Sequence, residues 1–226
     1  MATCTNVKVV SFKTIGLSDD LHAYVVAHNG PDPLIDELMA RTRSVLPDQA
    51  GMQIAPEQAR LFTFLTRLIG ARDAVEVGTF TGLSALAVAR GLADGGKLIC
   101  CDISEEYTSI AREFWARDGV DDRIELRIGP AVRTLAALPE GPQFDLAFID
   151  ADKTGYPAYW AEIVPRMRPG GVIAVDNVLR HGAVVEPDPD PDKAAILAFN
   201  AMVAADDRVE SVLLPIADGI TLARVR

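Results

Sequence analysis

The stretch AVEVGTFTG, residues 74–82, joins a short apolar strand to a glycine-containing turn, and a helical pattern follows at once. Gly78 and Gly82 let such a turn bend tightly and bring the backbone close to a ligand. The spacing lacks the third glycine of the G-x-G-x-x-G dinucleotide fingerprint, so it favours a nucleoside cofactor without a pyrophosphate. Asp102 ends the next predicted strand, where it can accept hydrogen bonds from ribose hydroxyls. The alternative is a plain strand-to-helix turn, with Asp102 as a helix N-cap or loop acid.

The pattern around this stretch predicts an α/β fold with a mostly parallel sheet, because short apolar runs alternate with longer amphipathic segments. Right-handed crossovers between parallel strands then place helices on both faces of the sheet. The predicted strands are residues 74–77, 97–102, 123–128, 144–150 and 171–176, and the helices between them are residues 82–92, 105–117, 131–138 and 156–167.

The flanking regions add helices before this core and a hairpin after it. Apolar residues recur at helical spacing in three N-terminal segments, residues 19–28, 32–46 and 56–69. After the fifth strand, an acidic, proline-rich loop leads to a helix over about 194–205 and to two strands that are joined at Asp218-Gly219, a strong hairpin signal. We expect a seven-stranded sheet with an antiparallel C-terminal strand, in one domain over 1–226 that has a helical flank (1–55) and a core (56–226).

The composition is that of a soluble globular protein of 226 residues, 49% apolar and 24% charged. A formal net charge of −10 opposes binding to phosphate backbones and anionic membranes, so neither nucleic acid nor membrane is an expected partner. No run approaches the roughly 18 apolar residues of a membrane span, and no signal-peptide pattern is found. Three cysteines give neither a disulfide framework nor zinc spacing, which favours a reducing, cytoplasmic location.

Oxygen-bearing side chains follow two of the predicted strands at the edge where ligands bind. Asp150 ends the fourth strand, and Asp176 and Asn177 end the fifth. If these strands are neighbours, the three side chains converge, and hard divalent cations such as Mg²⁺ prefer oxygen ligands. Strand-end Asp and Asn residues also cap turns and helices, which is the alternative.

Lys153 is the candidate general base, because it lies three residues after Asp150 and can reach a substrate hydroxyl held on that cation. A solvated surface lysine is the alternative. Asp152 either orients Lys153 or caps the following helix. Tyr156, Tyr159 and Trp160 recur at helical spacing, which favours core packing over a substrate wall.

Four segments, in this order along the chain, are similar to a known enzyme family: MQIAPEQARLFTFLTRLIGARDAVEVGTFTGLSALAVA (52–89), FDLAFIDADKTGYPAYW (144–160), GGVIAVDNVL (170–179) and LLPIADGITLARV (213–225). Together they resemble the metal-dependent class I O-methyltransferases, in particular the small bacterial members of the caffeoyl-CoA and catechol O-methyltransferase group. The resemblance covers residues 56–226 and implies a Rossmann-like fold, a homodimer and methyl transfer to a hydroxyl of a vicinal dihydroxy aromatic or a polyketide-like small molecule.

The resemblance also implies S-adenosylmethionine as cofactor and a divalent cation, usually Mg²⁺, with Ca²⁺ or Mn²⁺ as alternatives. The implied ligands of the cation are Asp150, Asp176 and Asn177, and the implied base is Lys153. The strand-end pattern and the family resemblance therefore indicate the same four residues. Asp150 also counts among the catalytic and cofactor-binding residues. The remaining cofactor contacts implied are Gly78, Thr79 and Ser84 at the methionine end, Glu76 nearby, Asp102 on the ribose, Ala131 beside the adenine and Met52 closing over the cofactor.

The sequence departs from this family after Asp176-Asn177. Many relatives have a tryptophan where this chain has Arg180 followed by His181, so we expect a different acceptor, such as a larger or anionic one. Asp218 in the terminal hairpin is a third candidate for acceptor binding, with turn chemistry as the alternative. The PDPDPD stretch, residues 187–192, is read either as a lid or as a solvated spacer.

Two rival functions use the same architecture. A nicotinamide-dependent oxidoreductase would bind NAD, and the missing third glycine argues against it. A non-catalytic cofactor-binding protein is disfavoured because Asp150, Lys153, Asp176 and Asn177 are all present.

Overall fold

The computed structural model describes residues 15–187 and 190–226, and within them the chain forms a seven-stranded sheet in the order β3-β2-β1-β4-β5-β7-β6. Strands β1 to β5 pair in parallel, whereas β7 runs antiparallel to both of its neighbours, β5 and β6. The strands are β1 (Asp73–Val77), β2 (Lys97–Asp102), β3 (Ile124–Ile128), β4 (Phe144–Ile149), β5 (Met167–Val175), β6 (Val209–Leu214) and β7 (Ile220–Val225).

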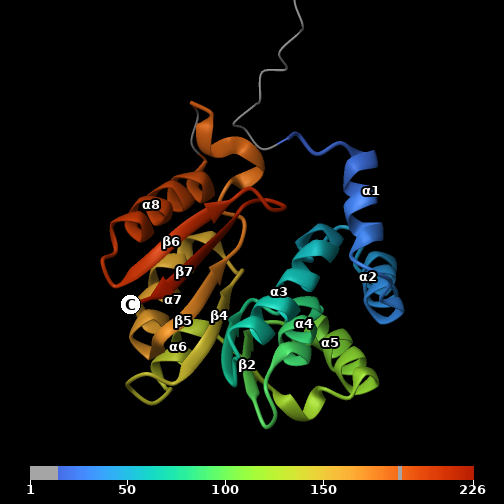
Figure 1. The fold of residues 1–226 in the computed structure, drawn as a ribbon, viewed down its shortest axis with the longest axis horizontal. Helices are drawn as coiled ribbons and strands as arrows, with labels where there is room; N and C mark the ends of the chain where they lie inside the picture. The colour runs from blue at the N-terminus through green and yellow to red at the C-terminus, as the bar shows by residue number, and fades with distance from the viewer. Residues whose placement is uncertain (1–14, 188–189) are drawn as a thin grey trace, which may run out of the picture.

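Helices cover both faces of this sheet (Figure 1). Those on one face are α2 (Pro33–Val45), α3 (Pro56–Leu68), α4 (Leu83–Gly91) and α5 (Glu105–Asp118), with α1 (Asp19–His28) at the outer edge. The other face carries α6 (Ala131–Ala136), α7 (Tyr156–Ile163) and α8 (Pro191–Ala205). Short 3₁₀ turns connect them, including η1 (Ala50–Met52), η3 (Lys153–Gly155) and η5 (Arg180–Val185).

The core consists of two apolar layers, one on each face, because successive strand residues point in opposite directions. On β4, Leu146 and Phe148 pack in the layer beneath α2 to α5, and Ala147 and Ile149 pack in the layer beneath α6 to α8. Phe62 of α3 lies with its ring centroid 4.5 Å from that of Phe148, which fixes α3 against the sheet. Within the described residues, we find no helix with the length and apolar character needed to cross a membrane.

The predicted fold class is confirmed: a mostly parallel sheet, helices on both faces and one antiparallel strand near the C-terminus. Several boundaries differ from the sequence prediction by a few residues; helix α7, for example, ends at Ile163 instead of residue 167, and two of the differences have a clear cause. Strand β5 starts at Met167 instead of Gly171, because Met167 pairs with Phe144 of β4 ahead of a register shift. Helix α8 starts at Pro191 instead of Ala194, because Asp190 caps it by accepting a hydrogen bond from the Lys193 amide at 2.8 Å.

Candidate functional site

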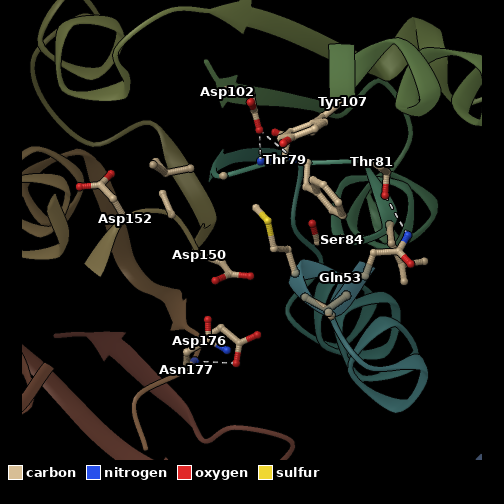
Figure 2. A pocket seen from close by; sticks show the side chains of 18 of the residues that line it. Gln53, Thr79, Thr81, Ser84, Asp102, Tyr107, Asp150, Asp152, Asp176 and Asn177 are labelled. Carbon is tan, nitrogen blue, oxygen red and sulfur yellow. Dashed lines mark hydrogen bonds between the residues drawn. The ribbon is translucent and has the colours of Figure 1, made fainter. Parts of the chain in front are cut away.

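A large pocket lies at the carboxyl ends of the central parallel strands, and its volume is about 1660 Å³. Pockets for one small ligand usually have volumes of roughly 300–1,000 Å³, so this one has room for two ligands side by side. Figure 2 shows Asp150 in the middle of the pocket, with Thr79 and Asp102 on one side and Asp176 and Asn177 on the other.

The glycine loop after β1 forms one wall of the pocket. Gly78 has a φ of +89°, and a Cβ at this position would lie 2.0 Å from the backbone oxygen of Asp150. Gly82 has a φ of +82°, and a Cβ there would lie 2.5 Å from the Cβ of Ala111 on α5. A side chain at either position would collide with a neighbouring chain segment, so glycine is required there whether or not a ligand binds.

Asp102 holds the glycine loop in place through its carboxylate. Its Oδ2 accepts hydrogen bonds from the backbone amides of Thr79 at 2.9 Å and Phe80 at 2.8 Å, and its Oδ1 accepts one from Ser104 at 2.8 Å. The N-cap of α5 is Ser104, so the alternative of Asp102 as an N-cap is wrong. Asp102 also lines the pocket, as a ribose contact must.

Glu76 is fully buried on β1, just behind the pocket wall. Neither of its carboxylate oxygens has a hydrogen-bond partner among the described residues. Burial raises the pKa of Glu76 to about 8, and the nearby hydroxyls of Ser84 and Thr79 offset only part of that rise. A buried carboxyl group without a partner is costly unless something else supplies a donor or a positive charge.

The other predicted cofactor residues are brought to the same pocket although they come from four separate segments. Met52 lies on η1 with more than half of its surface exposed, and Ala131 is the first residue of α6. Both line the pocket, as do Gly78, Thr79 and Ser84. Of the predicted set, Glu76 is the one that lies behind the pocket lining.

The side chain of Lys153 lies beside the oxygen atoms of the residues that were predicted to bind a cation. Its Nζ donates hydrogen bonds to Asp150 Oδ1 at 3.0 Å and to Asn177 Oδ1 at 2.6 Å. A third hydrogen bond, to the hydroxyl of Tyr156, is 2.8 Å long. The ammonium group thus provides positive charge between oxygens from two neighbouring strand ends, and the predicted convergence of these side chains is confirmed.

Asp150 and Asp176 are two carboxylates close together in a buried place. Burial and the charge of Asp150 raise the pKa of Asp176 to about 7, and burial also raises the pKa of Asp150. In the part of the chain that the structure describes, no group of three or more His, Cys, Asp or Glu side chains is arranged to hold a metal ion. The predicted ligand set contains only two carboxylates, and its third member, Asn177, is an amide.

Two residues that contact this group were not predicted as site residues. Gln58 of α3 donates a hydrogen bond from Nε2 to Asp176 Oδ2 at 3.0 Å, and no local sequence signal marks it. Tyr156 is part of the core, as predicted, but its hydroxyl also donates to the backbone oxygen of Asp176 at 3.0 Å. Asp152 bonds to the hydroxyl of Tyr159, so neither of the roles expected for it is observed.

The candidate acceptor residues lie at the pocket mouth around η5. Arg180 and His181 both have positive φ, and the Arg180 guanidinium pairs with Asp192 at 3.1 Å. The side chain of His181 is 84% exposed, and its backbone amide donates a hydrogen bond to the carboxylate of Asp218. All but Asp192 line the pocket. Of the PDPDPD stretch, residues 188 and 189 lie outside the described residues, whereas Asp190 is the N-cap of α8 and residues 191–192 lie in its first turn, so this half is part of a helix and not a solvated spacer.

Comparisons with known proteins agree with this geometry. The O-methyltransferase family matches residues 27–226. This chain belongs to that family. The methyltransferase is 43% identical over 207 residues to the Dictyostelium discoideum protein named "Probable caffeoyl-CoA O-methyltransferase 2", which covers 88% of each chain.

Two solved structures extend the comparison. The Bacillus cereus O-methyltransferase in complex with SAH has a TM-score of 0.83 at 32% identity, covering 92% of this chain and 97% of that one. The Streptomyces achromogenes O-methyltransferase TomG in complex with SAM has a TM-score of 0.81 at 31% identity, covering 91% and 96%. The predicted enzyme class and family are confirmed, and no comparison favours the oxidoreductase alternative.

Proposed function

We propose that this methyltransferase transfers a methyl group from S-adenosylmethionine to one hydroxyl of a vicinal dihydroxy aromatic, and that the reaction requires a divalent cation. The observation that carries the proposal is that Asp150, Asp176 and Asn177 line one pocket, large enough for cofactor and acceptor, in which the Lys153 ammonium bonds to Asp150 and Asn177.

Two features of the pocket and two similar solved structures support the cofactor assignment. Glu76 is a buried carboxyl group without a hydrogen-bond partner among the described residues, and it fits a cofactor that carries an ammonium group. Asp102 lines the pocket at a strand end, where ribose hydroxyls are bound in related folds. The similar Bacillus and Streptomyces structures hold SAH and SAM.

The chemistry of the donor set supports the cation. Two carboxylates and one amide offer oxygen ligands and leave positions open for two acceptor oxygens, which suits Mg²⁺ better than a thiolate-binding metal. Burial raises the pKa of Asp150, and burial together with the charge of Asp150 raises the pKa of Asp176, so a bound cation would stabilise the ionised form of both carboxylates. Asp150, Asp176 and Asn177 are therefore the residues that would hold it.

When bound, the cofactor supplies an electrophilic methyl carbon, and the cation favours the ionised form of the acceptor hydroxyl. The chain supplies the rest of the chemistry. Lys153 would act as the base in its neutral amine form: the ammonium that donates to Asp150 and Asn177 first releases a proton to solvent, and Nζ then accepts the proton of the acceptor hydroxyl. The glycine loop, fixed by Asp102, aligns the donor side of the pocket with the acceptor side, so that the two reactants meet in near-attack geometry.

The acceptor preference rests on the pocket mouth. Arg180 and His181 stand there where many relatives have a tryptophan, and both are polar side chains that can hydrogen-bond to an anionic or hydroxylated substituent of the acceptor. The Dictyostelium relative carries the name of a caffeoyl-CoA enzyme, which supports a phenolic acceptor. We also propose a cytoplasmic homodimer, for which the measured mass in solution is the test of the dimer.

The test of this function is transfer from isotope-labelled S-adenosylmethionine to a panel of catechols, caffeoyl esters and polyketide-like diols, with Mg²⁺ or with EDTA. We expect transfer to at least one diol and its loss in EDTA. Monohydroxy analogues of the accepted substrate are the matched control, because they cannot present two neighbouring oxygens. Transfer that persists in EDTA would refute the cation requirement while leaving the methyl-transfer assignment intact.

A further inference from the structure

Gln58 connects the N-terminal part of the chain to the strand-end acids. It lies in the first turn of α3, is 1% exposed and comes 118 positions before Asp176 in the sequence. Its Nε2 donates a hydrogen bond to Asp176 Oδ2 at 3.0 Å, and its Oε1 accepts one from the backbone amide of Ala55 at 2.8 Å.

The orientation of the Gln58 amide follows from its two partners. The backbone N–H of Ala55 can only donate, and an ionised Asp176 oxygen can only accept. A flipped amide would set oxygen against oxygen and N–H against N–H at these two contacts. The amide therefore has one favourable orientation, in which the NH₂ group faces Asp176.

The Asp176 carboxylate is held at both oxygens. Oδ2 accepts from Gln58, and Oδ1 accepts from the backbone amide of Asn177 at 2.8 Å. Figure 2 shows Asp176 beside Asn177, below Asp150. Each oxygen of an ionised carboxylate has a second lone pair, so both hydrogen bonds leave Asp176 able to ligate a cation. The bonds fix the rotation of the carboxylate, which is 2% exposed.

The element that carries Gln58 is itself rigid. Phe62, one turn further along α3, packs on Phe148 of the central strand β4, and Thr66 and Ala59 are fully buried. A side chain on such a helix can hold a ligand group more firmly than one on a loop, because its own rotamer is restricted by packing.

We propose that Gln58 is a positioning residue that holds Asp176 in the orientation needed to bind the divalent cation. This inference rests on the proposed function, in which Asp150, Asp176 and Asn177 form the cation site. A capping role for α3 alone predicts a loss of stability without a change in cation affinity, so the two roles can be separated by measurement.

The test compares Gln58→Met with wild type in binding of Mn²⁺ alone, followed by the EPR signal of free Mn²⁺ or by calorimetry. Met has a similar length and favours a helix, but it lacks the donor and the acceptor. We expect the Mn²⁺ dissociation constant to rise about 10- to 100-fold, the usual effect of losing a group that orients a metal ligand. In turnover, the Mg²⁺ concentration for half-maximal rate should rise, whereas kcat at saturating Mg²⁺ should fall much less.

Thr66→Val is the matched control, because Thr66 is as buried on the same helix and its hydroxyl donates a hydrogen bond within α3, to the backbone oxygen of Phe62. It should lower the melting temperature without changing Mn²⁺ affinity. If the Met variant does not fold, Gln58→Asn replaces it in the test, because the shorter asparagine keeps the amide group but cannot reach both the Ala55 amide and Asp176. Wild-type affinity in a folded Gln58 variant overturns the inference alone. A wild-type protein without saturable Mn²⁺ binding overturns the proposed cation site and the inference with it.

Discussion

Glu76→Gln is the substitution that most directly tests the electrostatics of the pocket. The folded protein raises the pKa of Glu76 from 4.5 to about 8 because the side chain is fully buried. The folded state therefore holds the proton more tightly than the unfolded chain does. Between these two pKa values the unfolded chain releases the proton first, so the free energy of unfolding falls as the pH rises.

The size of this effect follows from linkage. Between pH 5 and pH 8, a group with these two pKa values lowers the free energy of unfolding by about 3 to 4 kcal/mol. Glutamine has nearly the same shape and does not ionise. The Glu76→Gln variant without cofactor should therefore gain stability relative to wild type by about this amount as the pH is raised from 5 to 8.

The assay is urea-induced unfolding of the cofactor-free protein, followed by tryptophan fluorescence at pH 5, 6, 7 and 8. The difference between wild type and variant at each pH cancels the contributions of all other titrating groups. Glu210→Gln, the same change at an exposed position of β6, controls for the substitution itself. A wild-type to variant difference that stays constant from pH 5 to 8 would refute a buried, strongly perturbed Glu76.

Three further predictions concern the site. Lys153→Ala should leave cofactor affinity nearly unchanged while lowering kcat by at least about 100-fold, as for loss of a general base; unchanged turnover would remove Lys153 from the mechanism. Asp176→Ala should abolish Mg²⁺ stimulation and most methyl transfer, and a variant with full, Mg²⁺-dependent activity would contradict the cation site. Gly78→Ala should lower the free energy of unfolding by at least about 2 kcal/mol in urea titrations, because its Cβ would meet the Asp150 backbone oxygen and φ is positive. Wild-type stability would show that the loop can move away.

Much of the fold was predictable from local patterns. Strand β2 and helix α1 have the predicted boundaries, because apolar runs, caps and charged ends are signals that lie within a few residues of one another. The start of β5 was missed because it depends on pairing between Met167 and Phe144, which local sequence does not encode. The start of α8 was missed although Asp190-Pro191 is a recognisable N-terminal signal.

The sequence alone determined which chemistry-bearing residues stand at strand ends: Asp102, Asp150, Asp176 and Asn177. Parallel strands bring their carboxyl ends to one edge, so these residues had to share a pocket once the alternating pattern was recognised. Only the tertiary structure decided how they are oriented. The contact between Gln58 and Asp176, the hydrogen bond from Lys153 to Asn177 and the isolation of Glu76 depend on how segments far apart in the sequence pack together. Such contacts arise from the shape of the whole core, whereas secondary structure arises from neighbours in sequence.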